Sequence, residues 1–186
     1  MDLQQWLDQV PAWAAKPNRK TLFYESKLID VFGGIEISFS KKTGFVSASY
    51  QIGNKDFDKI AYGKICGAGI LIIQCGFVKN NRSIISNIDN PYELKRLTDN
   101  IFQEYSIFTS EISSVSKSFD ELISSHPRFP HADPRSASLR QLHAAILAFM
   151  LGEDWSVHIL KARAAGGPLP VKWIDEVVKR ISLRLR

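Results

Sequence analysis

The sequence predicts an α+β fold: a four-stranded antiparallel sheet covered by an N-terminal helix and by the helices that follow it, with a C-terminal helical subdomain. Apolar residues recur at every second position between Thr21 and Val78, which is typical of strands, and at helical spacing after Asn90. The 186 residues are 45% hydrophobic, which is enough for a globular core. No apolar run approaches the roughly 20 residues that a membrane-spanning helix needs.

A short amphipathic helix is predicted at the start of the chain. Asp2 is a suitable N-cap residue, and an apolar stripe follows at helical spacing, consisting of Leu3, Trp6, Leu7 and Val10. A further turn around Trp13 is expected before the sheet begins.

The first three strands are predicted between Thr21 and Gly53. The first is expected to span residues 21–31 and to end near Gly33 and Gly34. In the next two, separated by a turn at residues 41–44, apolar and polar residues alternate, as in strands with one face on a core. The polar positions, which we expect on an open face of the sheet and regard as candidate contact residues, are Glu36, Ser38, Ser47, Ser49 and Gln51.

The segment from Gly67 to Val78 is the most apolar stretch of the sheet region. Its length and its flanking glycines predict a strand buried on both faces, at the centre of the sheet. Before it, residues 53–58 are expected to form a turn, and residues 59–65 fit neither pattern. Cys66 and Cys75 have no metal-site spacing, so we expect buried free thiols.

Helices are predicted from Asn90 onward. Asn90, Pro91 and Glu93 form a good helix start, and Ser118 with Glu121 resembles a second capping box. After a proline-containing loop at residues 126–135, three more helices are expected: one ending at Gly152, one restarting at Asp154, and one after the break at residues 166–170. We predict a sheet domain with its covering helices at residues 1–127 and a basic helical subdomain at residues 128–186. The two parts are expected to pack together as one structural unit.

The net charge of +5 lies entirely in the last third of the chain. Up to Pro127, 14 Lys and Arg residues balance 14 Asp and Glu residues, whereas residues 128–186 hold 10 against 5. Such asymmetry indicates either an acidic partner or helices whose solvated faces are basic. The candidate contact residues in this region are Arg135, Arg140, Lys161 and Arg163.

No group of residues predicts a catalytic, cofactor or metal site. His126, His131 and Asp133 share a loop without the spacing of a specific metal site, and His143 and His158 are expected on two helices that can approach each other. The glycines of the sheet region lack the spacing of a phosphate-binding loop. Glu36 with Asp30 lacks the Glu-x-Lys step of metal-dependent nucleases, because residue 38 is serine.

The order of these features resembles a bacterial family of small domains. The features are the N-terminal helix, the basic segment that leads into Phe23 and Tyr24, the polar-faced strand pair, the apolar strand, and the hairpin at Leu151–Trp155. Some members of this family are encoded near polymorphic toxins and are thought to be immunity proteins. The resemblance covers most of the chain, and it transfers no functional residue.

These observations lead to three hypotheses about function. The first is a non-enzymatic protein-binding module, specifically an immunity protein that inhibits a cognate bacterial toxin by occlusion. The toxin is expected to have an acidic surface, and no cofactor is expected. The second is an enzyme with an unfamiliar site between sheet and helices. The third is a nucleic-acid-binding protein that uses the basic C-terminal helices. With neither a signal peptide nor a membrane span predicted, we expect a cytoplasmic location.

Overall fold

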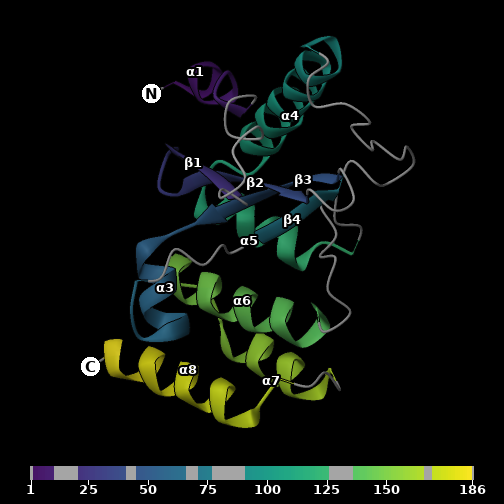
Figure 1. Cartoon of the computed structure of the whole chain (residues 1–186). Helices are drawn as coiled ribbons and strands as arrows, with labels where there is room; N and C mark the ends of the chain where they lie inside the picture. Colours follow the sequence, from purple (N-terminus) through teal and green to yellow (C-terminus); the bar gives the residue numbers. More distant parts are fainter. Residues whose placement is uncertain are drawn as a thin grey trace.

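The computed structural model describes residues 2–10, 21–40, 45–65, 71–76, 91–125, 136–165 and 169–185. It has the predicted α+β class, with an antiparallel sheet between helices (Figure 1). The strands pair in the order β1-β2-β3-β4, and they are β1 (Thr21–Lys27), β2 (Phe32–Ser40), β3 (Phe45–Gly53) and β4 (Leu71–Gly76). The described side chains of the sheet belong to the three strands β1 to β3.

The helices that flank this sheet fall into two groups. Those beside the sheet are α1 (Leu3–Leu7) and α4 (Pro91–Glu111). The others are α3 (Lys55–Tyr62), α5 (Val115–Ile123), α6 (Ser136–Leu151), α7 (Ser156–Ala164) and α8 (Val171–Arg184). In the part of the chain that the structure describes, no helix combines the length and the apolar character needed to cross a membrane.

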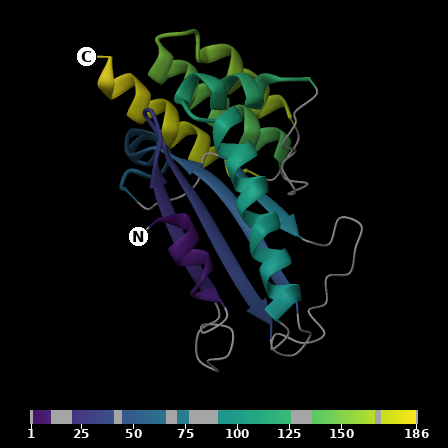
Figure 2. The same cartoon turned by 90° about the horizontal axis from the view of Figure 1, so that it is seen from above.

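Helices α1 and α4 cover one face of the sheet (Figure 2). Tyr50 of β3 donates a hydrogen bond to the carbonyl oxygen of Ile101 on α4, at 3.3 Å, and the ring of Trp6 on α1 lies 5.5 Å from that of Tyr24. The covered side chains of β2 and β3 include Ile35 and Ile37, which are fully buried. This face therefore holds the core of the sheet half of the molecule.

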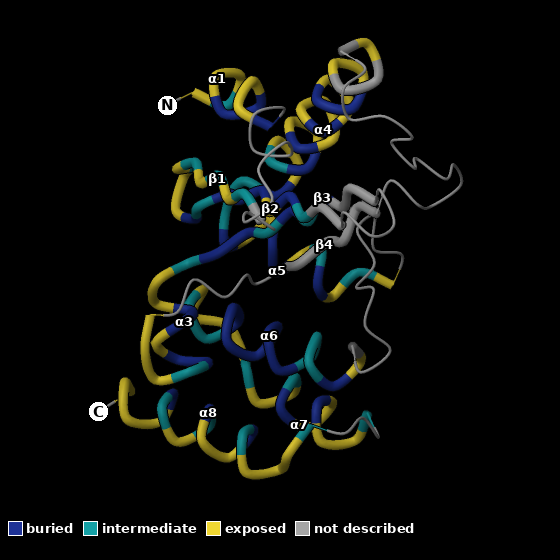
Figure 3. The backbone as a smooth tube through the Cα atoms, in the orientation of Figure 1, coloured by how far each residue is buried: buried dark blue, intermediate teal, exposed yellow. Residues whose placement is uncertain are grey.

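Helix α6 is the centre of the helical half. Every residue from Leu142 to Ala148 is buried, because α3, α5, α7 and α8 all contact this helix (Figure 3). A helix that is apolar all round is expected to be enclosed on all sides. Two of the enclosing helices, α3 and α5, precede residue 127, so elements from both predicted units share this core.

The predicted position of the apolar segment at the centre of the sheet is wrong. Strand β4 lies within it. Among the described strands, β4 pairs only with β3 and stands at the end of the strand order, whereas β2 and β3 are central. Apolar composition indicates that a strand is shielded from water, but it does not say which strand lies beside it. Residues 67–70, 77 and 78 of the predicted strand lie outside the described residues, as do Cys66 and the side chain of Cys75.

The glycines that were expected to end the first strand lie inside β2 instead. Gly33 pairs with Ser26, and Gly34 pairs with Glu25. On the helix side, a Cβ at Gly33 would clash with the Tyr105 hydroxyl, which forms a 2.5 Å hydrogen bond with Ser26 Oγ. Gly33 is thus required for the close approach of α4, and the strand continues through it.

Helix α3 replaces the predicted turn at residues 53–58 and includes most of the ambiguous segment. Its N-cap is Asn54, whose Oδ1 accepts hydrogen bonds from the backbone N–H groups of Asp56 at 2.8 Å and Phe57 at 3.0 Å. The buried side chains Phe57 and Ile60 fix the helix against the core. Asn54 is a residue type that favours a helix N-cap, whereas the sequence pattern predicts a turn between strands at residues 53–58.

The start of α5 also differs from the prediction. Ser114 is the N-cap and accepts a hydrogen bond from the backbone N–H of Lys117, at 3.2 Å, whereas Ser118 is buried and donates to the carbonyl oxygen of Ser114 at 2.8 Å. The predicted restart at Asp154 is also displaced, because α7 begins at Ser156 with Trp155 as its N-cap residue. Asn90 lies outside the described residues. Three other predicted boundaries are confirmed. Asp2 caps α1, α4 begins at Pro91, and α6 ends before Gly152, whose φ of 75° is in the left-handed region.

Candidate functional site

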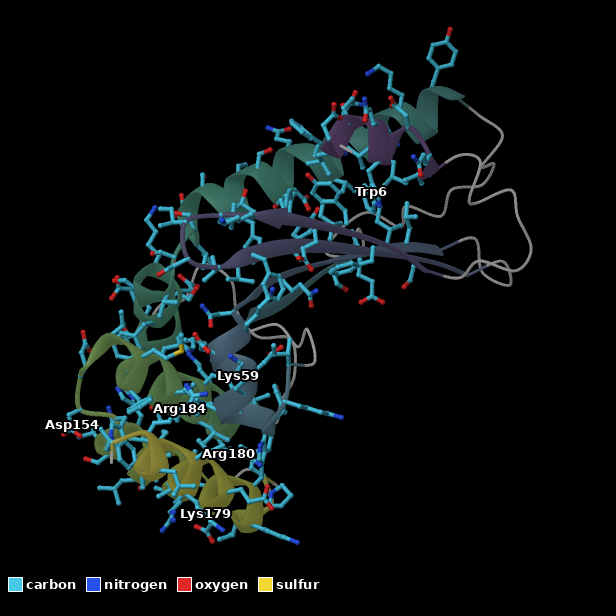
Figure 4. All side chains as sticks on the ribbon, turned by 90° about the vertical axis from the view of Figure 1, so that its left-hand side faces the viewer. Trp6, Lys59, Asp154, Lys179, Arg180 and Arg184 are labelled. Atoms are coloured by element: carbon cyan, nitrogen blue, oxygen red, sulfur yellow. The ribbon has the colours of Figure 1, made fainter. Side chains whose placement is uncertain are left out.

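The sheet has a second face, which the helices α1 and α4 do not cover. Figure 4 shows these two helices on one side of the sheet, while the remaining helices gather beyond its other side at one end. We call this second surface the open face and define it by these described residues: Phe23, Glu25, Lys27, Glu36, Ser38, Ser49 and Gln51.

The strand register brings the open-face residues into rows across the sheet. Glu36 lies directly opposite Phe23 on β1 and Ser49 on β3. Phe23 is 46% exposed, and Glu36 is also exposed. Directly opposite side chains in antiparallel strands have Cβ atoms about 5 Å apart. The face therefore presents an aromatic ring and a carboxylate side by side near its centre.

The sheet residues that the sequence singled out share this face. Ser38, Ser49 and Gln51 are half-buried, and the register places Ser47 opposite Ser38 on the same side of the sheet. The side chain of Ser47 lies outside the described part of the structure. The predicted alternation is thus confirmed for these strands, and the backbone holds the polar positions in a fixed pattern.

Sequence reasoning missed the contribution of β1 to this face. Phe23, Glu25 and Lys27 are exposed, whereas Leu22 and Tyr24, which alternate with them along β1, pack against the core. The alternation of these residues was a usable signal, because period two on an edge strand separates solvent-facing from core-facing positions. Phe23 also covers Gly34, where an added Cβ would lie 2.9 Å from the tip of its ring.

A groove of about 340 Å³ lies at one end of the open face. It is formed by the turn between β1 and β2 and by the first turn of α3, and its lining includes Lys27, Ile29, Phe32 and Lys55. The turn is held in place by Asp30. Its Oδ1 accepts from the backbone N–H of Val115 at 2.9 Å, and its carbonyl oxygen accepts from Asn54 Nδ2 at 2.8 Å.

The predicted basic surface does not form a single patch of available charges. Arg140 is half-buried, and its guanidinium donates to three backbone carbonyl oxygens at the end of α5. The acceptors belong to Leu122, to Glu121, at 3.1 Å, and to Ser124, at 2.6 Å. Arg163 is exposed but forms an ion pair with Asp175 at 2.6 Å.

Lys161 is exposed on α7, and Arg135 lies outside the described residues. Helix α7 packs against α6 and α8, so Lys161 and Arg163 lie in the helical half rather than at the sheet. Lys161 and Arg163 are therefore not brought together with the described contact residues of the sheet.

No family model, curated protein or solved structure matches this chain.

The two histidines of the helical hairpin have different packing partners. His143 lies edge-on to Phe57 with ring centroids 5.0 Å apart, whereas His158 lies edge-on to Phe119 at 5.5 Å and contacts Gln141 Oε1 at 3.0 Å. The two histidines on the helical hairpin therefore pack against different helices. Among the described residues, no three His, Cys, Asp or Glu side chains converge as metal ligands. His126, His131 and Asp133 lie outside that part.

Two ionisable groups in the helical half have shifted pKa values with clear physical causes. Partial burial lowers the pKa of His158, and the positive charge of Lys161 lowers it further. Hydrogen bonds from the hydroxyl and the backbone N–H of Ser156 lower the pKa of Asp154. In the sheet half, burial raises the pKa of Tyr105. None of these groups lies on the open face.

Proposed function

We propose that this protein is a protein-binding module that contacts its partner through the open face of the sheet. The observation that carries the proposal is the exposed pair of Phe23 and Glu36, opposite each other on neighbouring strands. Aromatic side chains, Phe among them, are enriched at protein interfaces relative to the rest of the surface. The predicted basic contact residues favour the sheet as the contact surface, because two of them, Arg140 and Arg163, already interact with groups of this chain.

The chemistry of the face indicates the chemistry of the partner. Glu25 and Glu36 are acidic and exposed, so the matching surface should present Lys, Arg or backbone N–H groups to them. The half-buried Ser49 and Gln51 offer additional donors and acceptors around the Phe23 ring. We therefore infer a basic contact surface, in contrast to the acidic surface that the net charge of the whole chain predicts.

The narrower form of the proposal is inhibition of a cognate toxin by occlusion. It is supported by the resemblance of the element order to a family with proposed immunity proteins. A sheet face is suited to occlusion, because its backbone is already ordered and little conformational entropy is lost on binding. In this form of the proposal, the protein covers the site of the toxin without carrying out chemistry on it.

Calorimetric titration against the purified product of the neighbouring gene tests both forms. The wild-type protein should bind it, and Glu36→Lys should weaken binding about tenfold or more, because it places a positive charge opposite a basic surface. Lys179→Glu on α8 serves as the matched control, since Lys179 is exposed and far along the chain from the sheet.

Added salt should weaken binding of the wild-type protein, because charges at the edge of an interface are screened. Equal affinities of the wild-type protein and Glu36→Lys would exclude the open face as the contact surface. An affinity that falls with Lys179→Glu alone would instead assign the contact to the helical half.

A further inference from the structure

At the outer edge of β1, the hairpin geometry fixes which backbone groups point away from β2, and no other described strand pairs with them. The backbone N–H of Leu28 donates to the carbonyl oxygen of Val31 at 2.9 Å, which fixes Leu28 and Val31 as a hydrogen-bonded pair. In an antiparallel ladder, such pairs alternate along the strand, so Ser26, Tyr24 and Leu22 also direct their backbone groups to β2. The backbone groups of Phe23, Glu25 and Lys27 therefore point away from the sheet.

Two contacts within the chain agree with this direction and mark the ends of the free edge. Trp6 Nε1 donates to the carbonyl oxygen of Phe23 at 3.1 Å. The backbone N–H of Ile29 donates to the carbonyl oxygen of Ser113 at 3.3 Å. Between these two points lie Glu25 and Lys27, both exposed. Among the described strands, none lies beside β1 on this side.

The edge is complementary to itself in one antiparallel register. If Glu25 lies opposite Lys27 of a second copy, the two-fold symmetry places Lys27 opposite Glu25 of that copy. The same register places Phe23 opposite Ile29, and these side chains are 46% and 75% exposed. Opposite charges and apolar side chains are both stabilising when they face each other across antiparallel strands.

The neighbouring registers lack this match. A shift of the second copy by two residues in one direction places Glu25 opposite Glu25, and a shift in the other direction places Lys27 opposite Lys27. Like charges in directly opposite positions are destabilising. A shift by a single residue places the outward-pointing backbone groups of one copy opposite residues whose backbone groups already bond to β2 in the other copy. No ladder of hydrogen bonds can then form between the two edges.

In this register the second copy's Phe23 lies opposite Ile29, which lines the groove at the end of the open face together with Lys27 and Phe32. Phe23 and Ile29 would both lose exposed apolar surface in the pairing.

We propose that two copies of this chain associate through their β1 edges, antiparallel, with Glu25 of each copy opposite Lys27 of the other. Each Glu25 and Lys27 pair exchanges two backbone hydrogen bonds, and the sheets of both copies become continuous. The contact is isologous, so it closes as a dimer and does not propagate into a filament. It engages the β1 residues of the open face, Phe23, Glu25 and Lys27, and leaves Glu36 on β2 available.

Sedimentation equilibrium of the full chain over about two orders of magnitude in concentration tests the proposal. The wild-type protein should show a monomer–dimer equilibrium. Glu25→Lys and Lys27→Glu should each raise the dimer dissociation constant about tenfold or more, because each change converts both attractive pairs into repulsive ones.

Two further arms separate the charge pairing from loss of folding. Glu25→Lys mixed with Lys27→Glu should form a heterodimer, since the first variant carries lysine at both edge positions and the second carries glutamate at both. The double variant E25K/K27E should recover self-association, because both pairs are restored in reverse. The exposed residues Glu153 and Lys179 provide matched controls, Glu153→Lys and Lys179→Glu, which should dimerise like the wild-type protein.

A wild-type protein that stays monomeric throughout would overturn the proposal and leave Glu25 and Lys27 as charges that protect an edge strand. Single variants that dimerise like the wild-type protein, or a mixture that does not associate, would also overturn it. Glu36→Lys should dimerise normally, so failure of this proposal is distinguishable from failure of the proposed contact through the open face.

Discussion

At the scale of single residues, Arg140 shows how a cation predicted to face a partner can serve the fold. The last carbonyl groups of a helix lack partners within it and carry the negative end of the helix dipole. The guanidinium of Arg140, from α6, donates to three such carbonyl groups around the end of α5, those of Glu121, Leu122 and Ser124. Its planar fork of donors suits several acceptors at once.

Arg140→Ala should therefore lower the free energy of unfolding by about 2 kcal/mol, which is the range for hydrogen bonds that involve a charged group. Arg140→Lys should recover part of this loss, because an ammonium group can reach fewer of the carbonyl oxygens at a time. Urea unfolding of the three proteins measures the difference.

Arg96→Ala is the matched control for this prediction, because Arg96 is exposed on α4. Its effect should be within about 0.5 kcal/mol of zero, as for most surface substitutions. Equal losses for Arg96→Ala and Arg140→Ala would show that the carbonyl contacts of Arg140 add nothing to stability.

At the scale of elements, the turn between β1 and β2 connects the sheet to two helices. Asn54 is the N-cap of α3, and its Nδ2 also donates to the carbonyl oxygen of Asp30 in the turn, at 2.8 Å. The Asp30 carboxylate in turn accepts from the first backbone N–H of α5, at Val115. A single residue of the turn thus positions the N-termini of both helices.

Substitutions at Asn54 can separate the two functions of its side chain. Asn54→Ala should cost about 1–2 kcal/mol, because it removes both the cap and the contact with Asp30. Asn54→Asp keeps the cap acceptor and replaces the donor by a carboxylate oxygen, so it should cost less than Asn54→Ala. Thermal unfolding measures the order of stability, and an alanine variant as stable as the wild-type protein would contradict the role of the cap.

The sequence predicted elements well where their pattern is local. The period of two in β2 and β3 placed Glu36, Ser49 and Gln51 on one face, and the capping residues at Asp2 and Pro91 marked helix starts. The position of β4 at the end of the strand order depends on which strand pairs with which, and no local pattern encodes that. The inward direction of Arg140 likewise depends on where α5 ends.

The sequence predicted less of the candidate site than of the fold. Alternation gave the polar positions of the central strands, but the exposed Phe23 and the β1 edge needed the register of the neighbouring strand. The opposition of Phe23 and Glu36 arises from residues 13 positions apart in the sequence, so only the paired strands show it.

At the scale of the whole molecule, contacts between distant segments hold the helical half together. Arg180 on α8 donates to the carbonyl oxygens of Ile60 at 3.2 Å and Ala61 at 2.9 Å, at the end of α3 (Figure 4). The indole N–H of Trp173 donates to Ala61 as well, at 2.9 Å, and its ring stacks on Tyr62 with centroids 5.8 Å apart. The last helix therefore closes against the segment that follows the third strand.

The stability of this assembly should depend on pH through His158, which lies where α5, α6 and α7 meet. Its ring is edge-on to Phe119 of α5, and its Nδ1 contacts Gln141 of α6. Burial and Lys161 lower its pKa in the folded protein below the ordinary value of 6.5. The fold thus favours the neutral ring, and protonation opposes it.

The direction of the effect follows from proton uptake. Well above pH 6.5 the ring is neutral in both states, so it adds no pH dependence. As the pH falls below this value, the unfolded chain binds a proton more readily than the folded one, and the free energy of unfolding decreases until the folded pKa is passed. Acidification from about pH 7 to about pH 5 should therefore destabilise the wild-type protein through His158.

His158→Gln should reduce this loss of stability on acidification, because the substituted side chain cannot be protonated yet can still form a hydrogen bond with Gln141. Urea unfolding of both proteins at the two pH values gives the comparison, and the other histidines, which both proteins retain, contribute equally. If the variant lost as much stability between the two values as the wild-type protein, the three-helix junction would not respond to the charge of His158. Since α6 is enclosed by helices from both ends of the chain, the destabilisation should appear in the unfolding transition of the whole molecule rather than in α7 alone.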